Sequence, residues 1–121
     1  PAEAAYLPVF CVANKFEGYL HWSWMNWADT PLTDTRFRLF APGDTYLIYP
    51  GPRSSVRYER FIEGVAMAEK VRILREEYAA KGNSAALDAL NKQVEAFAPA
   101  GIPTGQTAAG MVNALQQLLN P

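Results

Sequence analysis

The sequence predicts a mostly helical α/β chain with two short strands in its first half. Apolar side chains recur every three or four residues in four separate stretches, which is the spacing of amphipathic helices. Between the first two stretches lie two aromatic-rich runs without helical spacing, which favour strands. Because two short strands do not make a stable sheet alone, this order fits a helix–strand–helix piece of a larger α/β barrel. A small α+β domain is the alternative.

The first helix is predicted over residues 2–16, where apolar residues are spaced by three and four and Glu3 suits the helix dipole. Pro8 predicts either a kink or the true start of this helix, and Gly18 predicts its stop. The first strand is predicted over residues 19–24. It has no polar face, which is typical of a strand buried on both sides in a parallel sheet or barrel.

The second strand is predicted over residues 45–49 and is closed by the turn at residues 50–52. Ser54 or Ser55 is expected to cap a long helix that reaches about residue 80 and stops before Gly82. Its predicted apolar stripe consists of Phe61, Ile62, Val65, Ala68, Ile73, Leu74 and Tyr78. Ser84 is expected to cap the next helix, and residues 107–119 form the last one.

Composition excludes several classes of protein. There are 11 basic and 12 acidic residues in 121, a formal net charge of -1, so no basic surface for nucleic acid is expected. No apolar run is long enough for a membrane span. One cysteine and one histidine exclude a cysteine-based zinc site and a histidine cluster, and no phosphate-binding glycine loop occurs. We therefore expect no metal and no cofactor.

Three tryptophans fall within six residues, at positions 22, 24 and 27. Indole rings give flat surfaces on which sugars pack, and the nearby Asn26 amide can both donate to and accept from hydroxyl or acetamido groups. Alternation along the strand places Trp22, Trp24 and Asn26 on one face. A site at the carboxyl end of the strand favours Trp24, Asn26 and Trp27 over Trp22. Core packing is the alternative for each indole.

Other candidate polar groups are few. His21 is interpreted as a hydrogen-bonded core histidine, and Asp44 either holds a ligand hydroxyl or bonds its own turn backbone. The three charged residues Asp29, Asp34 and Arg36 are expected to brace a long loop. Because neither a Ser-His-Asp set nor a catalytic pair of acids is evident, no catalytic residue is assigned, and the chain alone is expected to be inactive as an enzyme.

Three blocks carry a resemblance to a known family. Residues 18–27, 43–51 and 54–64, in this order and spacing, resemble the last part of the glycoside hydrolase family 123 catalytic domain. The resemblance covers roughly residues 1–80 and leaves residues 84–121 as a helical C-terminal extension. It implies that this chain is the last helix–strand–helix portion of a (β/α)₈ barrel, with two extra C-terminal helices.

The resemblance also implies a function. Characterised members are exo-acting β-N-acetylgalactosaminidases, in which the acetamido oxygen of the substrate attacks the anomeric carbon while an adjacent Asp and Glu assist. No adjacent Asp-Glu pair occurs in this sequence. The chain is therefore expected to contribute pocket walls to a hydrolase of terminal N-acetylhexosamine glycans, with Trp24, Asn26, Trp27 and Asp44 as sugar contacts. A secreted or periplasmic location follows from the family alone.

Two alternatives to the hydrolase interpretation come from different classes of function. The first is a stand-alone module that binds a carbohydrate or a protein partner. The second is an oligomerisation element formed by the last helices. In every case we expect the isolated chain to self-associate, because unpaired strand edges and apolar surface favour association.

Overall fold

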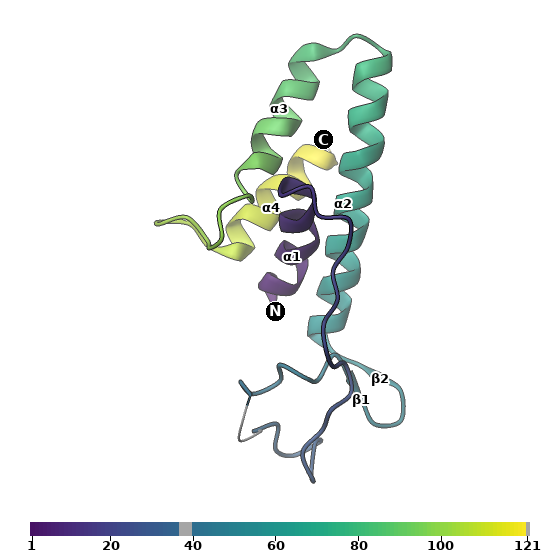
Figure 1. The fold of residues 1–121 in the computed structure, drawn as a ribbon, viewed down its shortest axis with the longest axis vertical. Coiled ribbons are helices and arrows are strands. Elements are labelled where there is room, and N and C mark those ends of the chain that lie inside the picture. The colour runs from purple at the N-terminus through teal and green to yellow at the C-terminus, as the bar shows by residue number, and fades with distance from the viewer. Residues whose placement is uncertain (37–39, 121) are drawn as a thin grey trace. The chain divides into compact units, whose positions relative to one another are not determined.

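The computed structural model describes residues 1–36 and 40–120, which form two compact units. One unit comprises residues 1–19 and 60–121, and the other comprises residues 20–59. The elements of the described residues are α1 (Ala2–Ala13), β1 (Ile48–Tyr49), β2 (Arg53–Ser54), α2 (Val56–Ala80), α3 (Ser84–Glu95) and α4 (Ala108–Leu119) (Figure 1). The prediction of a mostly helical chain with a small β element is confirmed.

Helix α1 starts where the sequence predicts and ends at Ala13, before the predicted end at residue 16. Pro8 lies inside the helix, so the alternative that the helix starts at Pro8 is wrong. The end is stabilised by Asn14, whose side-chain amide donates to the Phe10 carbonyl at 2.9 Å. Lys15 then takes a positive φ of 58°, which turns the chain out of the helix.

Helix α2 has the predicted extent. The Ser55 hydroxyl accepts a hydrogen bond from the Tyr58 backbone N–H at 3.2 Å, so the predicted cap is confirmed. Its predicted apolar stripe is partly wrong, because Ile62 is 46% exposed and Val65 is 48% exposed. The buried face instead follows a regular spacing of three and four residues through Gly64, Met67 and Val71, continued by the partly buried Leu74 and Tyr78.

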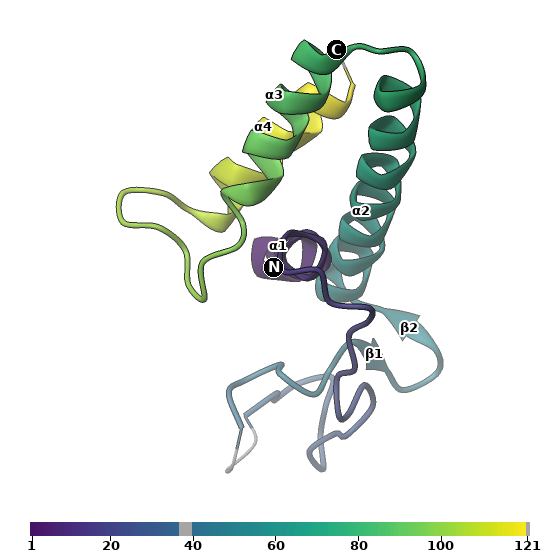
Figure 2. The same ribbon diagram turned by 45° about the horizontal axis from the view of Figure 1, so that its top comes forward.

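Helices α3 and α4 lie side by side, and α1 packs against both (Figures 1 and 2). The cap of α3 is Asn83, which accepts from the Ala86 N–H at 3.2 Å, and not the predicted Ser84. Thr107 caps α4 by accepting from the Gly110 N–H at 3.0 Å. The core of this unit is apolar and includes Val9, Leu90, Val94, Phe97, Val112 and Leu115.

The predicted strand over residues 19–24 is wrong. In the described residues this segment is irregular, and only the next residue, Met25, forms an isolated antiparallel bridge with Tyr46. The Trp24 carbonyl at the end of this segment accepts hydrogen bonds from the Leu47 and Ile48 N–H groups, but a strand buried on both faces needs regular pairing with a neighbour on each side. Leu20 is consequently 86% exposed and Trp22 57% exposed.

The second predicted strand, residues 45–49, is shorter than expected. Only Ile48–Tyr49 is a strand, β1, and it pairs antiparallel with β2, so that Ile48 faces Ser54 and Tyr49 faces Arg53. The turn at residues 50–52 therefore joins a hairpin, where the sequence predicted only the end of a strand.

Candidate functional site

The four predicted sugar contacts lie on two segments that are hydrogen-bonded to each other. These segments are residues 24–28 and 43–48, both within the unit of residues 20–59. The Trp24 carbonyl accepts from the N–H groups of Leu47 and Ile48 at 3.1 and 3.2 Å. The Asn26 N–H donates to the Thr45 carbonyl at 3.3 Å. The chain thus brings Trp24, Asn26 and Trp27 close to the turn that carries Asp44.

Side chains add further ties between the two segments. The buried Thr45 hydroxyl donates to the Asn26 carbonyl at 2.5 Å. The Tyr46 hydroxyl accepts from the Ala28 N–H at 2.6 Å, and the Trp27 indole N–H donates to the Ile48 carbonyl at 2.8 Å. Since the indole N–H is the only polar group of the Trp27 side chain and is already hydrogen-bonded, a ligand can contact only the apolar surface of this side chain.

Two polar side chains in this region remain available to a ligand. The Asn26 amide is half-buried and the Asp44 carboxylate is exposed, and neither makes a side-chain hydrogen bond within residues 1–36 and 40–120. The Asp44 backbone N–H donates to the Ala41 carbonyl at 3.0 Å, so the turn is closed by backbone atoms. The alternative that the Asp44 carboxylate is consumed by its own turn is therefore wrong.

The tryptophans differ in their surroundings. Trp24 is half-buried, and its ring meets Tyr58 edge-on with centroids 5.8 Å apart. The more exposed Trp22 packs on Phe40 with centroids 4.9 Å apart. Because residues 19–24 do not form a strand, alternation along a strand does not sort these rings into two faces.

His21 is hydrogen-bonded, as predicted, but it is not a core residue. Its Nε2 lies 3.0 Å from the Asp44 backbone carbonyl, and the ring is half-buried. A carbonyl oxygen only accepts hydrogen bonds, so Nε2 carries the proton in this contact. His21 therefore supports the Asp44 turn through the backbone.

Arg57 is a residue of this region that sequence reasoning missed. Its Nη2 donates to the Tyr46 carbonyl at 2.7 Å and to the Tyr49 hydroxyl at 3.2 Å. Nothing in the local pattern marks a carbonyl eleven residues earlier as its partner. Its position in the first turn of α2 is the only sequence signal.

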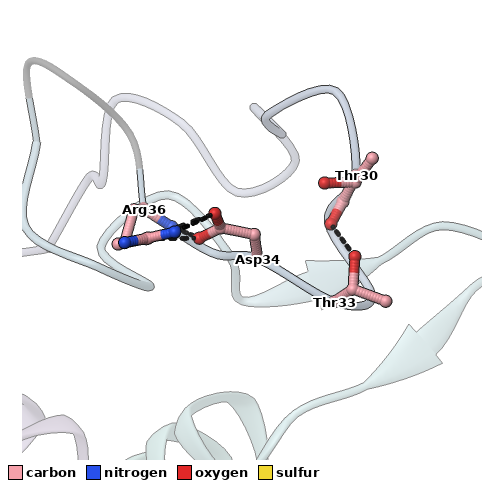
Figure 3. A network of polar contacts seen from close by, with 4 residues as sticks. All are labelled: Thr30, Thr33, Asp34 and Arg36. Carbon is pink, nitrogen blue, oxygen red and sulfur yellow. Dashed lines mark hydrogen bonds and ion pairs between the residues drawn. The ribbon is translucent and has the colours of Figure 1, made fainter.

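Within residues 30–36 of the long loop, side chains brace the chain through contacts with near neighbours (Figure 3). The Asp34 carboxylate forms an ion pair with the Arg36 guanidinium at 2.7 Å, and the Thr33 hydroxyl donates to the Thr30 carbonyl at 3.2 Å. Hydrogen bonds from Arg36 lower the pKa of Asp34 to about 2. Bracing by Asp34 and Arg36 is thus confirmed, whereas Asp29 joins no ion pair with a described residue.

Within residues 1–36 and 40–120, no three His, Cys, Asp or Glu side chains gather closely enough to hold a metal ion. No helix of these residues is both long and apolar enough to cross a membrane. An apolar groove of about 420 Å³ borders the loop at Thr30–Thr33 and Pro50, but none of the four predicted contacts lines it.

Comparison with known protein families identifies the family of the chain. The family profile for the glycoside hydrolase 123 catalytic domain matches residues 1–74. The chain belongs to this glycoside hydrolase family. The match includes all of residues 20–59, and hence all four predicted contacts, and it stops within α2. No curated protein sequence matches the chain.

Proposed function

We propose that the chain is the last part of a (β/α)₈-barrel hydrolase that removes terminal β-linked N-acetylhexosamine, of the N-acetylgalactosamine type, from glycans. In this proposal residues 1–80 complete the catalytic domain and residues 84–121 form a helical extension. The chain supplies walls of the sugar pocket, and the catalytic acids belong to another part of the protein. The glycan is therefore its partner through the whole enzyme.

One observation supports this assignment of the sugar contacts. Asn26 and Asp44 present side chains without hydrogen-bond partners among the described residues. They lie on two segments that are tied together by six hydrogen bonds between residues 24–28 and 45–48. Sugar sites in proteins combine such oriented polar groups with aromatic surfaces. Trp24 and Trp27 supply aromatic rings in the same segment.

Each residue has a distinct proposed role. The Asn26 amide donates to and accepts from the acetamido group or a hydroxyl of the sugar. The Asp44 carboxylate accepts from sugar hydroxyls. Trp27 contributes its ring alone, because its N–H is held by the Ile48 carbonyl, and Trp24 contributes apolar surface.

The chemistry of the family explains why these residues do not suffice. When the substrate's acetamido oxygen is the nucleophile, one carboxylate orients the acetamido group and a neighbouring carboxylic acid protonates the leaving oxygen. The sequence has no adjacent Asp and Glu. We therefore expect the isolated chain to cleave no glycoside.

The test compares the isolated chain with the longer protein that carries it. Hydrolysis of an aryl β-N-acetylgalactosaminide is measured beside that of the matched β-galactoside, which lacks the acetamido group. We expect activity only in the longer protein and only on the N-acetyl sugar. There, Asp44→Asn and Asn26→Ala should each lower kcat/KM by roughly 10- to 100-fold, as expected for lost hydrogen bonds to substrate. Asp29→Asn, an exposed loop change, is the matched control.

Other outcomes assign other functions. Cleavage by the isolated chain would place the catalytic acids within these 121 residues and overturn the proposal. A longer protein without hydrolytic activity would also overturn it. If the chain then bound N-acetylgalactosamine, followed by tryptophan fluorescence, a stand-alone carbohydrate-binding module would be the better description.

A further inference from the structure

Arg57 makes a two-point hydrogen bond to one backbone carbonyl. Its Nε and Nη2 lie 3.2 and 2.7 Å from the oxygen of Tyr46, and Nη2 also donates to the Tyr49 hydroxyl. Within the described residues Arg57 joins no ion pair with a carboxylate. Its charge therefore strengthens contacts to neutral oxygens, which is typical of a side chain that holds backbone in place.

The same guanidinium lies against Gly43. A Cβ built on Gly43 would stand 2.9 Å from both the Cζ and Nη1 atoms of Arg57. Gly43 also has a φ of 85°, in the left-handed region that favours glycine. A side chain at this position is therefore opposed by the backbone conformation and by the arginine that covers it.

Tyr46 connects Arg57 to the other segment of the site. The residue is 1% exposed, and its hydroxyl accepts from the Ala28 N–H at 2.6 Å. Arg57 thus fixes the carbonyl of Tyr46. The hydroxyl of Tyr46 in turn holds the backbone N–H of Ala28, two positions after Asn26. Through Gly43 it also borders the turn that presents Asp44.

We propose that Arg57 is a positioning residue that holds Asn26 and Asp44 in register for the sugar without touching it. This inference rests on the proposed function, because it presumes that these two side chains bind substrate. Positioning by Arg57 requires the planar fork of the guanidinium, since a single ammonium cannot meet the Tyr46 carbonyl along two directions.

The experiment uses the longer protein that hydrolyses the aryl β-N-acetylgalactosaminide. Arg57→Met keeps much of the side-chain length and removes the donors, Arg57→Lys keeps the charge, and Gly43→Ala disturbs the covered turn. The matched control is Arg53→Met, an exposed arginine of β2 that makes no side-chain hydrogen bond with a described residue. Hydrogen exchange of the Ala28 amide reports the register directly, and circular dichroism confirms that the variants fold.

We expect Arg57→Met and Gly43→Ala to raise KM about tenfold with kcat within about twofold, because misplaced contacts weaken binding while the acids lie elsewhere. Faster exchange of the Ala28 amide should accompany the change, and Arg57→Lys should recover only part of the affinity. Arg53→Met should match the wild type.

Failure of the inference and failure of the proposed function give different results. If the wild type hydrolyses the substrate and Arg57→Met leaves KM unchanged, or lowers kcat alone, only the positioning role of Arg57 is overturned. Full recovery by Arg57→Lys overturns it too, because charge would then suffice. If the wild type cleaves no N-acetylhexosaminide, the proposed function falls, and the positioning role falls with it.

Discussion

The α-carbon of Gly64 in α2 lies directly against the backbone of Ala5 in α1. A Cβ built on Gly64 would stand 2.5 Å from the Ala5 carbonyl oxygen and 2.9 Å from its α-carbon, closer than real carbon atoms approach. Both residues are buried. This contact sets which face of α2 meets α1.

Gly64→Ala should therefore destabilise the protein although alanine is the better helix former. In an exposed helix position the change would stabilise by about 1 kcal/mol. Here the added methyl meets backbone that cannot rotate away, and overpacking of this kind costs roughly 1–3 kcal/mol. Urea unfolding followed by circular dichroism measures the difference. Ala66→Gly, at an exposed position of the same helix, gives the intrinsic propensity for comparison, and a more stable Gly64→Ala variant would contradict the contact.

Stability should fall at alkaline pH. Burial raises the pKa of the Tyr6 phenol and of the Cys11 thiol above their ordinary values. The unfolded chain then loses these protons at a lower pH than the folded chain does. Ionisation of Tyr6 and Cys11 therefore leaves the free energy of unfolding unchanged below about pH 8. It lowers this free energy as the pH rises through the range of roughly 9–11.

The urea midpoint measured from pH 7 to pH 11 checks this prediction. Tyr6→Phe should flatten the upper part of the decline, and it also removes the 3.3 Å hydrogen bond that Tyr6 donates to the Phe97 carbonyl. Tyr19→Phe, at an exposed tyrosine, is the control. An equal alkaline decline in wild type and Tyr6→Phe would exclude a contribution from Tyr6.

The Asp34 carboxylate should titrate with a pKa of about 2, since Arg36 donates hydrogen bonds to it from both its guanidinium and its backbone. Arg36→Gln should return this pKa toward about 4. Carboxyl-carbon NMR measures both values. Because the pair is exposed, about 1 M salt should weaken the effect, and the change should leave stability nearly unaltered. A wild-type pKa near 4 would mean that the ion pair is rarely formed.

The isolated chain should self-associate. Leu20 and Met25 are large apolar side chains that are exposed close together in the chain. Leu20 lies in residues 19–24, where the sequence predicted a buried strand, and Met25 directly follows them. Light scattering across a concentration series should show species larger than 13.4 kDa. The double change Leu20→Ser with Met25→Ser should shift the chain toward the monomer, whereas Ile102→Ser, an exposed loop change, should not. A strictly monomeric wild type would contradict the prediction.

Local signals account for what sequence reasoning predicted correctly. The Ser55 cap, the start of the last helix near Thr107 and the stop at Gly82 depend on groups within a few residues of each helix end, so the local pattern of the chain contains them. The two segments that carry the predicted sugar contacts lie beside each other in the structure, whereas their role in binding sugar stays a prediction. Asp44 and Asn26 were predicted as a pair of sugar contacts from the order of the residue blocks that resemble the family, and not from geometry.

The amino-acid sequence by itself determined where the four helices lie and that the chain belongs to a glycoside hydrolase family. Tertiary structure alone decided which face of α2 is buried, because the glycine that allows α1 to approach carries no hydrophobic signal. It also decided that residues 19–24 form no strand and that Arg57 holds the Tyr46 carbonyl. Strand pairing and long-range hydrogen bonds depend on partners far along the chain, and no local spacing encodes them.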